Sequence, residues 1–218
     1  MRELKDLLHD EESAWTMMQG LLREAKNSVE VLPASDPDRA DALLATQVTT
    51  RSTMGAIVYE TGGLLVDSGW LRILGSGHPR LPRSLPSWNL GRSVQEAGQV
   101  PPFVFIGDDV LGGFFAVNGG GLGLGVGHVC YFAPDRQEWE DLERGYTEFI
   151  QECLLGDLDQ FYAGYRWTGW EEEVAALSGD RAFSIYPPLW AEAPSIGERH
   201  RRTVPIAELY DLYLGNET

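Results

Sequence analysis

One stretch of the chain is basic in a protein that is otherwise acidic. No Asp or Glu occurs between Asp67 and Glu96. Guanidinium groups bind phosphate or carboxylate through two parallel hydrogen bonds, so basic residues gathered here are candidates for holding a small anionic ligand. The candidate ligand-binding residues are Arg72, His78, Arg80, Arg83 and Trp88.

A second interpretation of these arginines is structural. Residues 75–89 read GSGHPRLPRSLPSWN, and this mixture of prolines, glycines and leucines predicts an ordered loop rather than a regular element. A partly buried guanidinium needs a counter-charge, and the chain has a surplus of carboxylates. We therefore favour pairing within the protein, which would fix this loop, and keep the anion site as the alternative.

Asp108 and Asp109 form a second candidate pair, for metal binding or for acid–base chemistry. Catalysis would also need a convergent His or Lys, which the sequence does not place. Neighbouring aspartates point apart on an extended chain, and between two strands they usually form turns through their side chains. We favour the turn interpretation.

The acidic surplus itself bears on the choice of partner. The net charge is −16, from 17 Lys and Arg against 33 Asp and Glu. Nucleic-acid binding normally needs a basic surface, so we expect no DNA or RNA partner. Solubility explains much of the surplus, and a basic protein partner is the sharper hypothesis. The candidate partner-binding residues lie in the most acidic stretch, residues 135–173, and are Glu140, Asp141, Glu148 and Glu152.

Motifs of known catalytic sites are missing from the sequence. It contains no GxSxG, no HExxH and no GxxxxGKS/T. The run Gly119–Gly127 has glycine at alternate positions and precedes a strand, so no helix N-terminus follows to receive a phosphate. We interpret it as a hairpin connection, or as a strand that another segment approaches closely. We expect no catalytic residues and no cofactor.

The cysteines and histidines predict neither a disulfide nor a metal site. Cys130 and Cys153 lack the CxxC spacing and fall on apolar faces, so buried reduced thiols are expected. The histidines are too widely spaced for a zinc site. No apolar run reaches membrane-spanning length and no secretory segment opens the chain, so we expect no membrane association and a cytoplasmic protein.

An antiparallel sheet in the middle of the chain must position these residues. Residues 101–133 predict a meander of three strands, Phe103–Gly107, Phe114–Asn118 and Val126–Ala133, with glycine-containing connections. Further expected strands are Val29–Leu32, Gln47–Arg51, Ala56–Glu60, Leu64–Asp67, Trp70–Leu74 and Phe183–Tyr186.

Helices are expected on both sides of this strand-rich region, beginning at Asp10, Ser35, Asp135, Asp157, Glu171 and Ala207. The helix at Asp135 starts with a capping box that Glu138 completes. Its apolar face would carry Trp139 and Phe149. The four acidic partner-binding candidates would lie on its opposite face.

The fold class that these elements predict is α+β, with a mostly antiparallel sheet and helices packed on it. We find no internal repeat and no linker of low complexity, so a single domain over residues 1–218 is expected. Its parts are a helical N-terminal extension (1–45), the strand-rich sheet (46–133), helices on the sheet (134–178) and a C-terminal strand, loop and helix (179–218).

Nearly the whole chain resembles a bacterial family catalogued as domain of unknown function 2625. The resemblance rests on the strings TGGLLVDSGWLRILGSGHPRLPRSLPSWN (Thr61–Asn89), FIGDDVLGGFFAVN (Phe105–Asn118), YFAPDRQEWEDLERGYTEFI (Tyr131–Ile150) and FYAGYRWTGW (Phe161–Trp170). It implies no established activity and no catalytic residues.

A looser resemblance covers Phe103–Leu155. The order of strand, acidic turn, strand, glycine loop, strand and capped helix is similar to the core of the SUKH superfamily, which includes bacterial toxin-immunity proteins and fungal cell-wall-synthesis scaffolds. The segment Thr46–Leu74 and the part after Phe161 exceed the usual compact form of that core. The resemblance implies a protein that acts by binding other proteins, and an acidic surface would suit a basic toxin domain.

Three functions follow from these observations. The first is a non-enzymatic, immunity-like module that binds a basic protein. The second is a binder of a small anionic ligand, or an unrecognised enzyme, built around the basic stretch. The third is a structural protein that forms a homodimer through its glycine-rich strands, with Gly119–Gly127 in the interface.

Overall fold

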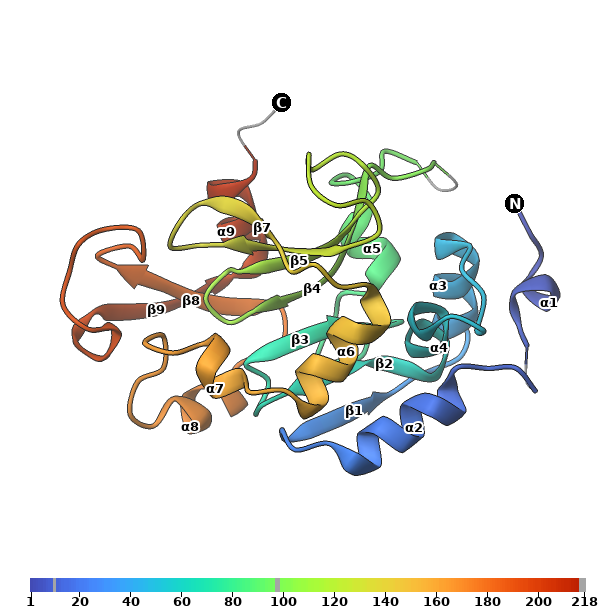
Figure 1. Cartoon of the computed structure of the whole chain (residues 1–218), viewed down its shortest axis with the longest axis horizontal. Helices are drawn as coiled ribbons and strands as arrows, with labels where there is room; N and C mark the ends of the chain where they lie inside the picture. Colours follow the sequence, from blue (N-terminus) through green and yellow to red (C-terminus); the bar gives the residue numbers. More distant parts are fainter. Residues whose placement is uncertain (10, 97–98, 216–218) are drawn as a thin grey trace.

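The computed structural model describes residues 1–9, 11–96 and 99–215 (Figure 1). Asp10, expected to open a helix, and Ala97, Gly98 and residues 216–218 lie outside the described residues. The main sheet has seven antiparallel strands in the order in which they occur along the chain. They are β1 (Val29–Pro33), β2 (Thr61–Val66), β3 (Leu71–Leu74), β4 (Phe103–Asp109), β5 (Phe114–Asn118), β6 (Val129–Ala133) and β7 (Glu138–Asp141). The predicted α+β class is confirmed.

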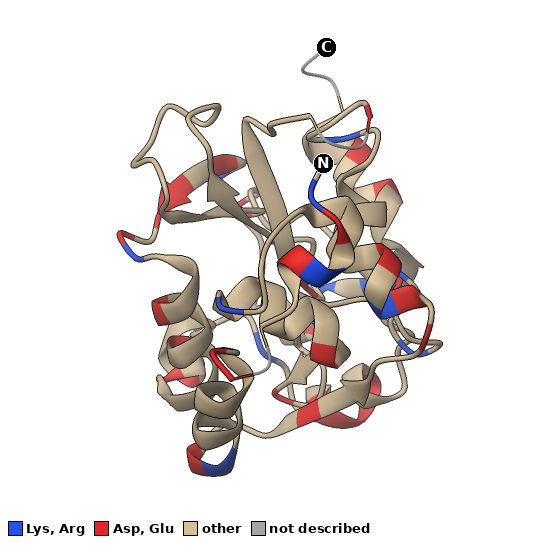
Figure 2. Ribbon diagram, turned by 90° about the vertical axis from the view of Figure 1, so that its right-hand side faces the viewer, with Lys and Arg blue, Asp and Glu red and all other residues tan. Residues whose placement is uncertain are grey.

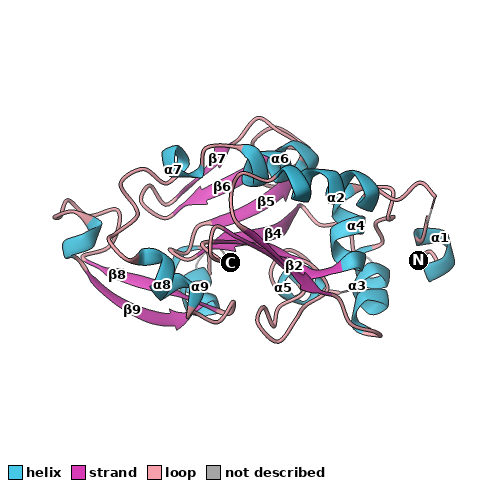
Figure 3. Ribbon diagram, turned by 90° about the horizontal axis from the view of Figure 1, so that it is seen from below, coloured by secondary structure: helices cyan, strands magenta, loops and turns pink. Residues whose placement is uncertain are grey.

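Both faces of this sheet are covered by helices, α6 (Tyr146–Leu155) and α7 (Leu158–Phe161) on one face and α5 (Leu85–Asn89) and α9 (Ile206–Tyr213) on the other (Figure 3). Neighbouring residues of β5 show the division, because successive side chains of a strand point to opposite faces. The Phe114 ring lies 5.8 Å from the ring of Tyr210 in α9. The Phe115 ring lies 5.0 Å from the ring of Phe149 in α6.

Four helices come from the N-terminal part of the chain; two of them contact α6 and one contacts α5. They are α1 (Leu4–Leu7), α2 (Trp15–Glu24), α3 (Asp38–Thr46) and α4 (Thr53–Glu60). Helix α2 packs beside α6, and α4 packs against β2. Leu7, Met18 and Leu43 are fully buried and join the main hydrophobic core. The burial of these residues attaches each helix to the sheet.

The C-terminal part adds a smaller sheet at one end of the molecule (Figure 1). After α8 (Trp170–Ala175), strands β8 (Arg181–Tyr186) and β9 (His200–Pro205) form an antiparallel pair, with a 3-10 helix (Ile196–Glu198) in their connection. The Phe183 amide donates a hydrogen bond of 2.7 Å to the Val110 carbonyl. This bond joins β8 to the turn between β4 and β5.

Two strands expected before β2 are wrong. Residues 47–51 lie between α3 and α4, and the expected strand Ala56–Glu60 belongs to helix α4. Ser52 caps this helix, because its hydroxyl oxygen accepts the Gly55 amide at 3.1 Å. The helix is buried from Gly55 to Val58, so its sequence lacks the polar face that usually distinguishes a helix from a buried strand.

The helix expected from Asp135 begins later than predicted. Residues Glu138–Asp141 form the edge strand β7, which pairs with β6, and α6 begins only at Tyr146. The open edge of β6 offers a full set of backbone hydrogen bonds, which prevails over the local capping pattern. As a result Trp139 and Phe149 lie on opposite faces of the sheet, with Trp139 6.1 Å from Phe105 and Phe149 5.0 Å from Phe115, ring to ring.

The glycine run is a loop between β5 and β6, and β6 begins at Val129 rather than Val126. Asn118 organises this loop from inside, donating to the Leu124 carbonyl at 2.8 Å and accepting from the Gly120 amide at 2.8 Å. A hairpin connection is therefore confirmed. The homodimer through this run stays a prediction.

The two cysteines are buried free thiols, as expected. Burial raises the pKa of Cys130 to about 11, so its thiol is protonated at neutral pH. Within the described part of the chain, no helix combines the length and the apolar composition that a membrane span requires.

Candidate functional site

The basic stretch forms a buried ion cluster around one carboxylate. Arg72 on β3 lies directly opposite Asp108 on β4, and its Nη2 is 2.7 Å from Asp108 Oδ1. Arg83 approaches the other oxygen, with Nη1 2.6 Å from Oδ2. The Asp108 side chain is fully buried and the Arg72 side chain is 2% exposed. The structure thus matches the interpretation that these arginines pair within the protein.

The terminal nitrogens of the two guanidinium groups also reach backbone carbonyls. Arg72 Nη2 donates to the Asp109 carbonyl at 2.7 Å, and Nη1 donates to the Arg181 carbonyl. Arg83 Nη2 donates to the Gly179 carbonyl at 2.6 Å. The cluster therefore joins the sheet, the proline-rich loop and the start of β8. Asp108 lies within β4 and its carboxylate pairs with the two arginines, so the turn interpretation is wrong for this residue.

Trp88 belongs to the same cluster, whereas His78 and Arg80 do not. The Arg83 guanidinium lies 4.5 Å from the centre of the Trp88 ring. Arg80 pairs at the surface with Glu30, and His78 Nδ1 accepts the Arg80 amide at 3.1 Å. The cavity between Arg72 and Arg80 measures only about 10 Å³, room for roughly one water molecule. Two of the five predicted ligand-binding residues therefore lie apart from the ion cluster, and binding of an anion by the five stays a prediction.

Asp109 forms the turn that the sequence predicts. Its Oδ1 accepts the amides of Leu111 and Gly113, both at 2.9 Å. Its Oδ2 accepts the Tyr131 hydroxyl at 2.8 Å and the Tyr162 hydroxyl at 3.4 Å. Burial raises the pKa of Asp109 and also raises the pKa of Tyr162 well above its ordinary value. The carboxylate has four donors inside the protein, which is a structural arrangement.

The buried tyrosines predict a loss of stability in alkali. Because the pKa of Tyr162 is higher in the folded chain than in the unfolded chain, the unfolded chain releases this proton first as the pH rises. Stability is therefore intact below about pH 10 and falls above it, by about 1.4 kcal/mol per pH unit for each such tyrosine. Urea unfolding at a series of alkaline pH values measures this slope.

Two variants test the origin of that slope. Tyr162→Phe keeps the ring and removes one titrating hydroxyl, so the fall should become less steep. Tyr186 is 70% exposed, and Tyr186→Phe should leave the slope as it is in the unmodified protein. An equally steep fall in Tyr162→Phe would contradict the assignment.

The four acidic partner-binding candidates are divided between two elements. Glu140 and Asp141 lie on β7, while Glu148 and Glu152 lie on α6. Glu140 pairs with Arg136 at 2.8 Å. Asp141 holds the glycine loop, because its Oδ2 accepts the Gly125 amide at 2.9 Å and its Oδ1 lies 3.0 Å from His128 Nδ1. The Glu143 amide lowers the pKa of Asp141 most, by donating a hydrogen bond to its carboxylate.

Three of these four residues border one surface feature, which we call the α6 groove. It consists of two adjoining hollows of about 460 and 580 Å³ that share Arg144 and Glu152. Its acidic lining residues are Asp141, Glu143, Glu148, Glu152 and Asp157. Its apolar lining includes Phe149, Leu158 and Phe161. Glu140 lies outside it and borders a cavity of about 160 Å³ beside Tyr131 and Tyr165.

Sequence reasoning missed several residues of this groove. Glu143 and Asp157 belong to the acidic stretch, but the sequence placed them on two different helices. Phe161 was expected in the second of these helices without a role in binding, and it is 42% exposed. The misplaced start of the helix concealed the groove, because it removed the turn between β7 and α6 that forms one wall.

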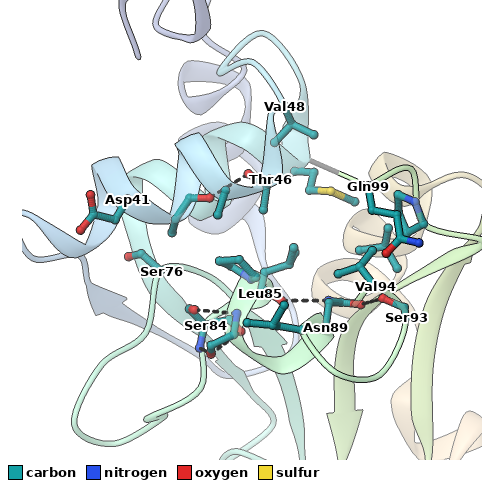
Figure 4. A pocket seen from close by; sticks show the side chains of 18 of the residues that line it. Asp41, Thr46, Val48, Ser76, Ser84, Leu85, Asn89, Ser93, Val94 and Gln99 are labelled. Atoms are coloured by element: carbon teal, nitrogen blue, oxygen red, sulfur yellow. Dashed lines mark hydrogen bonds between the residues drawn. The ribbon is translucent and has the colours of Figure 1, made fainter. Parts of the chain in front are cut away.

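A second hollow, of about 400 Å³, lies between α3 and α5, and we call it the α3–α5 groove (Figure 4). Leu85 and Asn89 of α5 and Thr46 of α3 line it. The Ser93 hydroxyl donates to Asn89 Oδ1 at 2.6 Å, and Asn89 Nδ2 donates to the Phe105 carbonyl at 2.8 Å. These polar groups are bonded to the protein itself, so the groove presents mainly apolar surface.

Metal-binding arrangements are missing from the part of the chain that the structure describes, where no three His, Cys, Asp or Glu side chains are grouped to hold an ion. The absence of a metal and of a cofactor stays a prediction.

Relatives of this chain are found in two bacteria. It is 47% identical over 212 residues to the uncharacterised protein YbfG of Escherichia coli (strain K12), covering 97% of this chain and 95% of that relative. It is 39% identical over 211 residues to an uncharacterised protein of Haemophilus influenzae (strain ATCC 51907 / DSM 11121 / KW20 / Rd), covering 96% of this chain and 92% of that relative. No solved structure matches the chain significantly. Residues 4–209 match a family described as protein of unknown function DUF2625, and the chain therefore belongs to this family.

Proposed function

We propose that this protein is a non-enzymatic binding module for a basic protein and that the α6 groove is its binding surface. One observation carries the proposal, namely that five carboxylates and a single arginine border a groove with an apolar floor. Acidic segments are spread over many elements of the ribbon (Figure 2), so the groove is defined by this combination and not by net charge alone. Such complementarity favours rapid and selective association with a basic partner.

The apolar residues supply the part of the interaction that charge does not. Phe149 and Leu158 form the floor, and Phe161 stands 42% exposed at the side. A Lys or Arg side chain of the partner can lay its methylene groups on this surface and keep its charge near a carboxylate. Aromatic anchors surrounded by polar residues are the usual composition of a protein interface.

The accessible carboxylates are on α6, in the turn before it and, with Asp157, at the start of α7. Glu143, Glu148 and Glu152 are exposed. Glu152 pairs with Arg144 at 3.1 Å, and Glu148 Oε2 accepts the Gly145 amide at 3.0 Å, which starts the helix. Asp141 contributes mainly by position, since it holds the neighbouring loop. Glu143 and Glu152 are therefore the residues to change in a test.

The partner class that we propose is a basic toxin domain, which would make this protein immunity-like. This choice comes from the sequence pattern of Phe103–Leu155, which resembles the SUKH core; in the structure, strand β7 stands where that pattern has its capped helix. A cytoplasmic location goes with the proposal and is supported by the two free, buried cysteines, since disulfides are typical of oxidising compartments.

Affinity capture from the protein's own cells tests the proposal. We expect the tagged protein to retain a basic protein partner at low salt and to lose it as the salt concentration rises. The double variant Glu143→Lys with Glu152→Lys should lower retention at least about tenfold, because two attractive charges become repulsive. The matched control is Glu192→Lys with Glu172→Lys, two exposed carboxylates outside the groove.

Two results would contradict the proposal. If retention of the partner did not depend on the salt concentration, the interaction would not be electrostatic as proposed. Equal retention by the groove variant and the control variant would move the contact away from α6. Circular dichroism and thermal unfolding of both variants check that each is folded, so that a loss of retention can be assigned to the lost contact.

A further inference from the structure

The α3–α5 groove has the size and the lining of a small-molecule site. Its volume of about 400 Å³ falls within the range of ligand pockets. Leu85, Val94 and Val104 line its interior. Leu90, 52% exposed, stands at its margin and extends the apolar surface outward. The groove therefore favours a ligand with an apolar body.

Carboxylates stand at the margin of this groove without basic residues beside them. Asp38 and Asp41, both exposed, come from the first turns of α3, and Glu96 comes from the segment after α5. The described lining residues include no Lys, Arg or His. The electrostatic potential at the margin thus favours a cation.

The arginines nearest in sequence are directed elsewhere. Arg39 of α3 pairs with Asp36 at 2.9 Å and lies 4.5 Å from the centre of the Tyr59 ring. Arg92 lies 3.8 Å from the centre of the Trp88 ring, on the side of α5 that faces the ion cluster. Neither side chain lines the groove, so neither neutralises its carboxylates.

We propose that the α3–α5 groove binds a small amphiphilic organic cation, with its apolar body between α3 and α5 and its amine or guanidine group near Asp38 and Asp41. An anion of the same shape would bind less well, because the carboxylates at the margin would repel it. A strongly polar ligand would find few free hydrogen-bonding groups inside, because Asn89 and Ser93 already bond within the protein. This site is separate from the α6 groove and its proposal is independent of the proposed function.

Three probes that share one body and differ in charge test this proposal. They are 4-phenylbutylamine, 4-phenylbutanol and 4-phenylbutanoate, titrated into the full chain at low salt and followed by ligand-observed NMR and calorimetry. We expect the amine to bind about tenfold more tightly than the carboxylate, with the alcohol between them. Added salt should bring the three affinities together.

Variants then locate the site. Ala45→Trp fills the groove from α3, where Ala45 is exposed and the new ring need not enter the core, and it should abolish binding of all three probes. Asp38→Asn with Asp41→Asn should weaken the amine about fivefold and leave the alcohol unchanged. Glu24→Gln on α2 is the matched control and should change neither.

The opposite results are equally clear. Equal affinities for the three probes, or tighter binding of the carboxylate, would overturn the cationic class. Unchanged binding of the amine to Ala45→Trp would overturn the location. Retention of a protein partner by Ala45→Trp is expected in either case, so failure here and failure of the proposed function are distinguishable.

Discussion

Replacing Asp108 with Asn is expected to lower the free energy of unfolding by about 3–5 kcal/mol, because removing one member of a buried ion cluster leaves the others uncompensated. Asn keeps the size of the side chain and removes the charge that faces Arg72 and Arg83. Both guanidinium groups would remain buried, with side-chain exposures of 2% for Arg72 and 10% for Arg83. Urea unfolding monitored by fluorescence and circular dichroism measures the loss.

The surface pair Arg80–Glu30 provides the control. Its side chains are 49% and 52% exposed, so Arg80→Ala should lower the free energy of unfolding by no more than about 1 kcal/mol. A triple variant, Arg72→Met with Asp108→Leu and Arg83→Met, should recover much of the stability lost in Asp108→Asn, since apolar replacement of a whole buried ion group is often tolerated. A cost of less than about 1 kcal/mol for Asp108→Asn would show that the cluster is not the strong constraint described above.

The second large effect is expected at Trp70. This side chain is fully buried, and its ring lies 5.4 Å from Tyr162, 5.7 Å from Trp167 and 5.1 Å from Trp170, centre to centre. It thereby connects the turn before β3 with α7 and α8. Trp70→Ala should lower the free energy of unfolding by about 3–5 kcal/mol, because the change removes these contacts and leaves a large cavity. Thermal and urea unfolding give the measurement.

Trp70→Phe separates packing from hydrogen bonding at the same position. Within the described residues the Trp70 Nε1 group has no hydrogen-bond partner, so replacing indole by phenyl removes no hydrogen bond. Phe should therefore cost clearly less than Ala. Trp190 is 42% exposed, and Trp190→Ala should have a small effect. Comparable losses in all three variants would contradict a specific role for Trp70.

Local patterns in the sequence were sufficient to predict the central sheet. The runs at Phe103–Gly107 and Phe114–Asn118 are rich in aromatic and β-branched residues and are separated by turn residues, so the strands and their antiparallel pairing followed directly. The hairpin of β2 and β3 followed from the same signals. Helix α4 and strand β7 did not, because α4 is buried all round and β7 exists only by pairing with the exposed edge of β6.

The sites depended on contacts that no local pattern reveals. Arg72 and Asp108 are 36 positions apart and meet only because of the β3–β4 register. The surplus of carboxylates predicted that the arginines would pair with an acidic residue of the protein. It did not predict that this residue would be Asp108. The α3–α5 groove combines Asp38 with Val104, and nothing in either stretch indicates the other. Tertiary arrangement, and not residue type, determines these surfaces.

The bonds from Arg72 and Arg83 to the carbonyls of Arg181 and Gly179 have a consequence for synthesis on the ribosome. Strands that pair in chain order can assemble as they emerge, one hairpin after another. The nascent sheet, however, presents two guanidinium groups whose final acceptors are not yet translated. We expect the chain to complete its last packing step only after translation has passed β8, late in the life of the nascent polypeptide.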